Sequence, residues 1–181
     1  MRTLKALLVV IISYLASTLL SIYVSTYSLT AFGSSSTMLT QMLFQYYGFM
    51  VFLAPIVAGL ILWAARSGIS HVISRYVFKS KEGKFRDLLY GFGMSHFPLI
   101  FIPIFSLFFF LGNIGIFLGF FLSFFFMLLI YAYFVNSIIT FQRLEWKRSL
   151  VCVVVAEVII MFLAFFLLYP MFSPVFNYIP L

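Results

Sequence analysis

The sequence predicts an all-α polytopic membrane protein, a bundle of five transmembrane helices in a single integral membrane domain that covers residues 1–181. The first observation is composition: 65% of the residues are hydrophobic and 8% are charged, whereas a typical soluble domain is ~25% charged. The second is a set of five apolar stretches of ~20 residues, the length that crosses a bilayer. The third is the position of the basic residues, which fall in every second segment between these stretches.

The five expected spans follow one another with short connections. Arg2 and Lys5 precede the first apolar run, which continues to about Tyr27. This run is longer than the ~7–15 apolar residues of a cleaved signal peptide, so we expect a retained span. The letters "GNIG" (112–115) separate the third and fourth spans and predict a tight turn in an antiparallel hairpin. The expected boundaries are about 6–28, 43–65, 88–111, 115–139 and 149–169.

The Lys and Arg residues predict how the spans are oriented. Five spans place all 11 of them on one side of the membrane, whereas an even number places at least one basic cluster on the other. Segments 29–42, 112–114 and 170–181 contain no charged residue. Cytoplasmic loops carry an excess of Lys and Arg. We therefore expect a cytoplasmic N-terminus and an outside C-terminus in the cell membrane or, alternatively, in the membrane of the endoplasmic reticulum or Golgi.

The segment between the second and third expected spans has a helical pattern of its own. Apolar residues from Ile69 to Val77 repeat at helical spacing, which predicts a short cytoplasmic amphipathic helix at about 67–78 lying in the membrane interface. Basic residues beside a membrane attract anionic lipid by ~1 kcal/mol each, although orientation alone also accounts for them. The expected lipid or partner surface comprises Arg75, Lys79, Lys81, Lys84, Arg86, Arg143, Lys147 and Arg148.

This layout resembles the Yip1 family of five-span membrane proteins. The stretch "HVISRYVFKSKEGKFRDLLYGFGMSHFPLIFIPIF" (71–105) resembles the interfacial helix of that family, its Gly-containing basic turn, and a third span that begins with small residues and proline. In this chain that beginning consists of Gly91, Gly93, Ser95 and Pro98. The resemblance covers roughly residues 45–168.

The Yip1 resemblance implies a non-enzymatic protein that acts by binding. Eukaryotic members act in traffic between endoplasmic reticulum and Golgi, and they bind Rab-type GTPases and one another. Those members carry a long cytosolic N-terminal region with acidic motifs, whereas about five residues precede the first expected span here. We therefore expect a short, prokaryotic-type member without that region, with membrane lipids, a second copy of the chain or other membrane proteins as partners.

Enzyme and metal signatures are weak, and we expect neither catalysis nor a cofactor. The letters "GMSHF" (93–97) begin like a nucleophile elbow, but Phe97 occupies the second Gly position and no strand precedes it. His71 and His96 lack companion carboxylates at metal-ligand spacing. The basic residues lie beside apolar spans, as orienting charge does, so we expect no nucleic-acid partner.

Small residues and prolines inside the spans predict how the helices pack. Gly115 and Gly119 form a GxxxG pair, and Ala54 and Ala58 form a similar pair of small residues, which permits close approach of two helices. Proline removes a backbone donor and should bend a span. The prolines within spans are Pro55, Pro98 and Pro103.

Glu157 is an acidic residue in the middle of the fifth expected span, "SLVCVVVAEVIIMFLAFFLLY" (149–169). Small residues share its helical face and bulky residues oppose it, which predicts that its side chain points into the bundle. His96 and Asn136 lie at a similar expected depth, so we expect an intramembrane polar cluster of Glu157, His96 and Asn136. Such a cluster is a structural clamp between helices or, alternatively, the site of a small transporter or channel.

Overall fold

The computed structural model describes residues 2–32, 35–80 and 82–176, and these form helices without any β-strand. Five helices in the described part of the chain are long and apolar enough to cross a membrane, as the sequence predicts. In chain order the elements are α1 (Arg2–Phe32), α2 (Ser35–Val72), η1 (Ile73–Val77), α3 (Phe85–Met94), η2 (Phe97–Phe101), α4 (Ile102–Phe105), η3 (Ser106–Leu111), α5 (Gly112–Gln142) and α6 (Trp146–Phe176).

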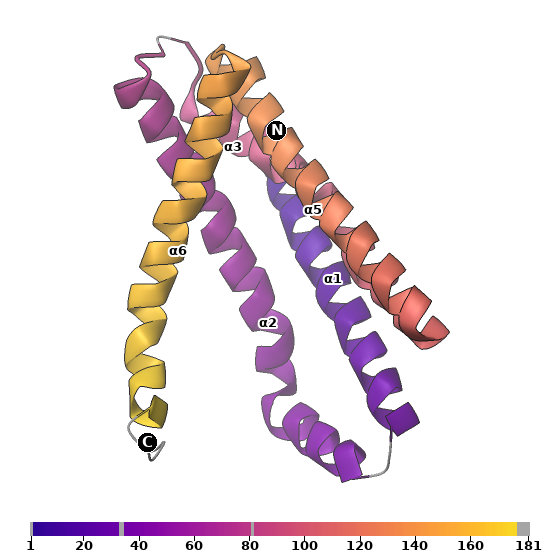
Figure 1. The fold of residues 1–181 in the computed structure, drawn as a ribbon. Coiled ribbons are helices and arrows are strands. Elements are labelled where there is room, and N and C mark those ends of the chain that lie inside the picture. Colours follow the sequence, from indigo (N-terminus) through magenta and orange to yellow (C-terminus); the bar gives the residue numbers. More distant parts are fainter. Residues whose placement is uncertain (1, 33–34, 81, 177–181) are drawn as a thin grey trace.

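The helices converge at one end of the molecule and separate toward the other (Figure 1). The core lies toward the converging end, where α3 packs against α1, α2 and α5. Phe92 of α3 stacks on Phe134 of α5 with ring centroids 4.7 Å apart. Trp63 of α2 donates a hydrogen bond from its indole nitrogen to the backbone oxygen of Leu89, at 2.9 Å. These contacts tie three helices together at one level.

The third expected span is a series of short elements rather than one helix. It runs through α3, the 3₁₀ turn η2, the four-residue α4 and the 3₁₀ turn η3. Pro98 lies in the first turn of η2 and Pro103 lies in α4. Because proline lacks a backbone donor and its ring crowds the preceding turn, regular α-helical bonding is interrupted along this segment. Pro55 has a milder effect, since α2 continues through it.

The interfacial helix expected at about 67–78 is not a separate element. The helix α2 continues to Val72, and the π-helical turn η1 extends it to Val77. The expected amphipathic pattern is partly present, because Val72 and Tyr76 are exposed while Ile73 is buried. The physical reason for the continuity is that only Gly68 interrupts the helix-forming pattern, and one glycine is tolerated within a helix.

A glycine of the hairpin packs closely, whereas the expected pair of small residues in α2 does not. Gly112 has a φ of 71° at the tight turn between η3 and α5, as the hairpin requires. Gly115 lies so close to the backbone of Phe108 in η3 that no side chain fits there, so this glycine packs within the hairpin. The expected pair of Ala54 and Ala58 makes no such contact, because both residues are exposed on α2.

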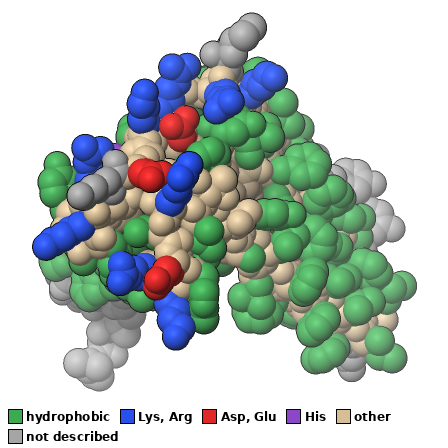
Figure 2. Space-filling view, turned by 90° about the horizontal axis from the view of Figure 1, so that it is seen from above, with side chains coloured by type: hydrophobic (Ala, Val, Ile, Leu, Met, Phe, Trp, Pro, Cys, Tyr) green, Lys and Arg blue, Asp and Glu red, His purple; other side chains and the backbone are tan. Residues whose placement is uncertain are grey.

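The basic side chains gather at the end where the helices converge (Figure 2). At this end α1 begins, η1 leads toward α3, and α5 passes to α6. We call this surface the cationic end. Lys81, which was expected to belong to it, lies outside the described residues. The exposed basic residues of the cationic end are Arg2, Lys5, Arg75, Lys79, Lys84, Arg86, Arg143, Lys147 and Arg148.

Candidate functional site

Glu157 of α6 forms an ion pair with Arg66 of α2, residues that are 91 positions apart in the sequence. Arg66 donates from Nε to Oε1 at 2.5 Å and from Nη2 to Oε2 at 3.2 Å. Each of the two side chains is 17% exposed. A two-point contact of this kind fixes both the distance and the relative orientation of the two groups. The pair therefore joins α6 to α2, and we call it the polar pair.

Aromatic side chains surround the polar pair. The guanidinium carbon of Arg66 lies 5.7 Å from the centre of the Phe134 ring, within cation–π range. Tyr14 and Tyr131 are close enough to interact electrostatically with both charges. A guanidinium is planar and weakly hydrated, so it tolerates an aromatic, partly dry setting better than an ammonium group does. This environment explains how an Arg can lie among apolar helices.

His96 lies next to the polar pair, in the turn between α3 and η2, but its ring bonds the backbone of α3. Its side chain is 2% exposed, and its ring is 5.8 Å from that of Tyr14 and 5.5 Å from that of Phe134. Nδ1 is 2.7 Å from the backbone oxygen of Phe92. Because a carbonyl oxygen only accepts, Nδ1 carries the hydrogen. Within the described residues, Nε2 is buried and has no hydrogen-bond partner.

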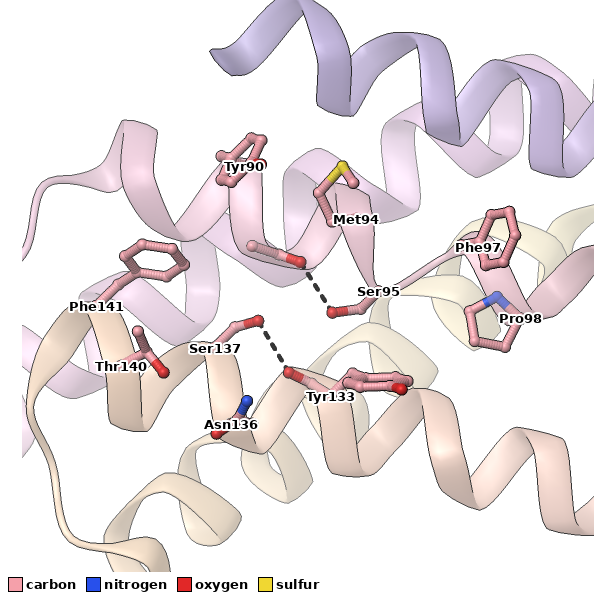
Figure 3. Close-up of a pocket in the computed structure, with 11 residues that line it drawn as sticks. Tyr90, Met94, Ser95, Phe97, Pro98, Tyr133, Asn136, Ser137, Thr140 and Phe141 are labelled. Atoms are coloured by element: carbon pink, nitrogen blue, oxygen red, sulfur yellow. Dashed lines mark hydrogen bonds between the residues drawn. The ribbon is translucent and has the colours of Figure 1, made fainter.

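Asn136 occupies a different place from the other two residues of the expected polar cluster. It is exposed on α5 and lines a cavity of about 470 Å³ between α3 and α5 (Figure 3). The structure thus separates the three residues: Glu157 bonds Arg66, His96 bonds the backbone of α3, and Asn136 faces the cavity. The physical reason is the rotation of α5, because residues two positions apart on a helix point to nearly opposite sides. Phe134, rather than Asn136, faces Arg66.

The wall of this cavity combines hydroxyl-bearing and apolar side chains. Ser95 and Ser137 each donate a hydrogen bond to a carbonyl of the preceding turn, and both bonds are 2.8 Å long. Their hydroxyls therefore have their donors occupied. The cavity is lined by Tyr90, Gly91, Met94, Ser95, Phe97, Pro98, Tyr133, Asn136, Ser137, Thr140 and Phe141.

A hydrogen-bond network holds the connection between η1 and α3 against the end of α5. The Gln142 side chain is 1% exposed, and its Oε1 accepts a hydrogen bond from Ser74 Oγ at 3.2 Å. Its Nε2 lies 3.3 Å from His71 Nδ1. Ser80 Oγ donates to the backbone oxygen of Gln142 at 2.7 Å. Since the last carbonyls of a helix lack partners within the helix, Ser80 satisfies one of them and positions the loop.

Among the described residues of the cationic end, one basic side chain, Arg143, forms an ion pair. Glu82 pairs with Arg143 at 2.7 Å, but both side chains are more than half exposed, and such pairs contribute ~0–1 kcal/mol. Arg86 donates from Nε to Thr3 Oγ1 at 2.9 Å, which links α3 to α1. In the part of the chain that the structure describes, the ion pairs are Arg66–Glu157 and Arg143–Glu82. The cationic end thus retains a strong excess of positive charge.

Sequence reasoning missed Arg66 as a partner of Glu157. The expected second span ended at residue 65, which placed Arg66 in the basic loop. The sequence does contain a signal for its position, because Trp63, Ser67 and Ser70 follow one another at helical spacing on either side of Arg66. In the structure all three residues are buried. That spacing indicates a helix that continues past Arg66. An Arg within a continuing helix is the expected companion of a single acidic residue in a neighbouring span.

Comparisons of this chain with protein-family models, with curated proteins and with solved structures gave no match. The Yip1 resemblance stays a prediction from the sequence. Among the described residues, no group of His, Cys, Asp or Glu side chains is arranged to hold a metal ion. The site therefore consists of the polar pair, the cavity that Asn136 lines, and the cationic end.

Proposed function

We propose that this chain is a non-enzymatic, multi-pass membrane protein that binds anionic membrane lipid at its cationic end. The single observation that carries the proposal is the concentration of exposed Lys and Arg side chains at the end where the helices converge (Figure 2). Positive side chains at a membrane surface attract anionic lipids by ~1 kcal/mol each. The opposite connections of the sequence contain no charged residue.

The proposed topology has five spans, with the cationic end in the cytoplasm. The five long apolar helices support it, because an odd number of spans puts every basic connection on one side. The exposed apolar residues Val72 and Tyr76 flank Arg75 at the end of α2. This mixture of apolar and basic side chains suits the level of the lipid headgroups. A Yip1-type role, in which the protein organises membranes by binding lipids or other membrane proteins, agrees with this arrangement.

The polar pair favours binding over the alternative of a small transporter or channel centred on Glu157. Both oxygens of the Glu157 carboxylate accept hydrogen bonds from Arg66. An arginine holds its proton at any physiological pH, so it cannot pass a proton on. The cavity is lined by Asn136 and its neighbours rather than by Glu157. We therefore assign the polar pair a clamping role between α2 and α6.

The proposed lipid binding is tested by removing charge without removing bulk. In a Lys79→Gln, Lys84→Gln and Lys147→Gln triple variant, we expect weaker enrichment of phosphatidylglycerol around the protein purified from mixed phosphatidylglycerol and phosphatidylcholine membranes. Each lost charge should lower the enrichment by up to about fivefold. Native mass spectrometry counts the bound lipids. The matched Lys→Arg triple variant keeps the charge and should behave like the wild type; equal enrichment in the Gln variant would refute the proposal.

The orientation is tested with single cysteines in a Cys152→Ala background. Ser35 begins α2 at the end opposite to the cationic end, and Ser80 lies in the loop of the cationic end. A cysteine at position 35 should react with an impermeant thiol reagent that is applied outside intact cells, and one at position 80 should react only after the cells are opened. The reverse pattern would overturn the topology.

A further inference from the structure

The cavity between α3 and α5 lies beside the cationic end, and its position matches one part of a lipid molecule. Tyr90 follows Arg86 by four residues on α3, which is ~6 Å along the helix axis. Thr140 precedes Arg143 by three residues, or ~4.5 Å. The hydrocarbon core of a bilayer is ~30 Å thick and the whole bilayer ~40–45 Å, so each interfacial layer is about 5–7 Å thick. The rim of the cavity that is nearest to the cationic end thus lies where the ester groups of a lipid meet its phosphate.

We infer that this cavity seats the ester region and one acyl chain of an anionic glycerophospholipid, whose phosphate rests on the basic residues above it. The inference rests on the proposed function and deepens it, because it names the place where one lipid molecule is held. The cavity volume of about 470 Å³ lies in the range of small-molecule sites, ~300–1,000 Å³.

The two walls of the cavity, on α5 and on α3 with η2, differ in polarity. Asn136 and Thr140 are exposed on α5 and carry an amide and a hydroxyl that donate hydrogen bonds. The ester carbonyls of a lipid are acceptors. On α3 and η2, the wall continues with Met94, Phe97 and Pro98, which suit a hydrocarbon chain (Figure 3). None of the described residues that line the cavity is charged. The phosphate therefore has to remain outside, at the level of the cations.

The cavity lies where the third span changes from the helix α3 to the 3₁₀ turn η2. At Gly91, α3 and α5 touch: an added Cβ would lie 2.7 Å from the Phe141 ring and 2.8 Å from Ser137 Oγ. Three residues later α3 ends at Met94, and the chain continues to the 3₁₀ turn that contains Pro98. The regular helix thus stops at the level of the cavity, while η2, α4 and η3 continue to pack along α5. A site of this kind is preformed, so binding costs little reorganisation.

The free donors of the cavity favour a lipid over a helix of a second copy or of another protein. The backbone carbonyls of a membrane-spanning helix are bonded within that helix. A docked helix therefore offers no regular row of acceptors to Asn136 and Thr140. A glycerophospholipid offers ester carbonyls to these donors and a negative charge at the level of Arg86 and Arg143. The lipid thus matches both the donors and the charges.

Photolabelling locates the lipid. The wild-type protein is placed in phosphatidylcholine vesicles that contain a phosphatidylglycerol with a diazirine in one acyl chain, and adducts are mapped by peptide mass spectrometry after irradiation. We expect adducts concentrated in segments 90–98 and 133–141. Equal labelling of exposed residues on α6, such as Met161 and Phe165, would overturn the inference, as would equal labelling of the cavity by a phosphatidylcholine probe. A crosslink from the cavity to a second copy would also overturn it.

Variants of the cavity separate this inference from the proposed function. Asn136→Leu with Thr140→Leu should lower the yield of phosphatidylglycerol adducts in the cavity about eightfold, the effect of two hydrogen bonds within a bilayer. Thr140→Trp should fill the cavity and remove the adducts, whereas Val154→Trp, at an exposed site of α6, should not. If these variants label like the wild type while the Lys→Gln triple variant loses lipid enrichment, the cavity inference fails and the proposed function stands. If the triple variant also keeps its enrichment, both fail.

Discussion

The polar pair and the Asn136 cavity are both polar places among apolar helices, and they have opposite characters. Glu157 and Arg66 neutralise each other and are mostly enclosed, at 17% exposure each. Asn136 is exposed and faces a cavity whose described lining residues are all uncharged. A charge among apolar helices is costly unless an opposite charge accompanies it. An amide costs less and can remain available. The difference indicates that the charged groups stabilise the bundle, whereas the neutral groups are free to bind.

The largest effect is expected when the polar pair is broken from one side. Glu157→Leu leaves the Arg66 charge without its partner. Loss of one member of a buried pair costs about 3–5 kcal/mol, and we expect the lower end because the pair is partly exposed. The measurement is the thermal unfolding of the purified protein in detergent. Glu145→Leu changes an exposed carboxylate at the cationic end and serves as the control. Equal stability of the two variants would show that the polar pair does not stabilise the contact between α2 and α6.

A smaller loss is expected for Glu157→Gln, which keeps the shape of the side chain. The amide oxygen still accepts one hydrogen bond from Arg66, but its nitrogen cannot accept the second, and the charge is gone. Loss of one of the two hydrogen bonds together with the carboxylate charge should cost about 1.5–3 kcal/mol. The same unfolding measurement places this variant between Glu157→Leu and the wild type. A variant as unstable as Glu157→Leu would mean that net charge alone matters at this site.

The sequence alone predicted the framework better than the contacts. The five apolar helices and an inward-facing Glu157 follow from span length and from the small residues on one face of α6. The face on which Asn136 lies did not follow, because α5 is apolar all round and its pattern does not define its rotation. Arg66 was missed for a different reason. The end of a membrane span was inferred from the first charge, whereas α2 continues beyond it.

Replacement of the whole polar pair should cost less than removal of one member. In Arg66→Met with Glu157→Leu, no charge remains without a partner, and the two side chains keep much of their volume. Buried pairs replaced in this way are often neutral or gain stability. We expect the double variant to lie within about 1 kcal/mol of the wild type. The four proteins of the cycle are compared in one detergent. Additive losses would show that Arg66 and Glu157 act independently and would contradict the clamp.

The smallest effect on stability is expected for a substitution of Asn136, which lines the exposed cavity. Asn136→Leu removes an exposed amide that lines the cavity and leaves the polar pair intact. Substitutions at exposed sites change the free energy of unfolding by about 0.5 kcal/mol or less. The thermal unfolding curve should therefore match that of the wild type, in contrast to Glu157→Leu. Binding should respond in the opposite order: Asn136→Leu weakens retention of phosphatidylglycerol, whereas the double variant of the polar pair retains it. A marked loss of stability at Asn136 would give it a structural role and would erase the distinction between the two regions.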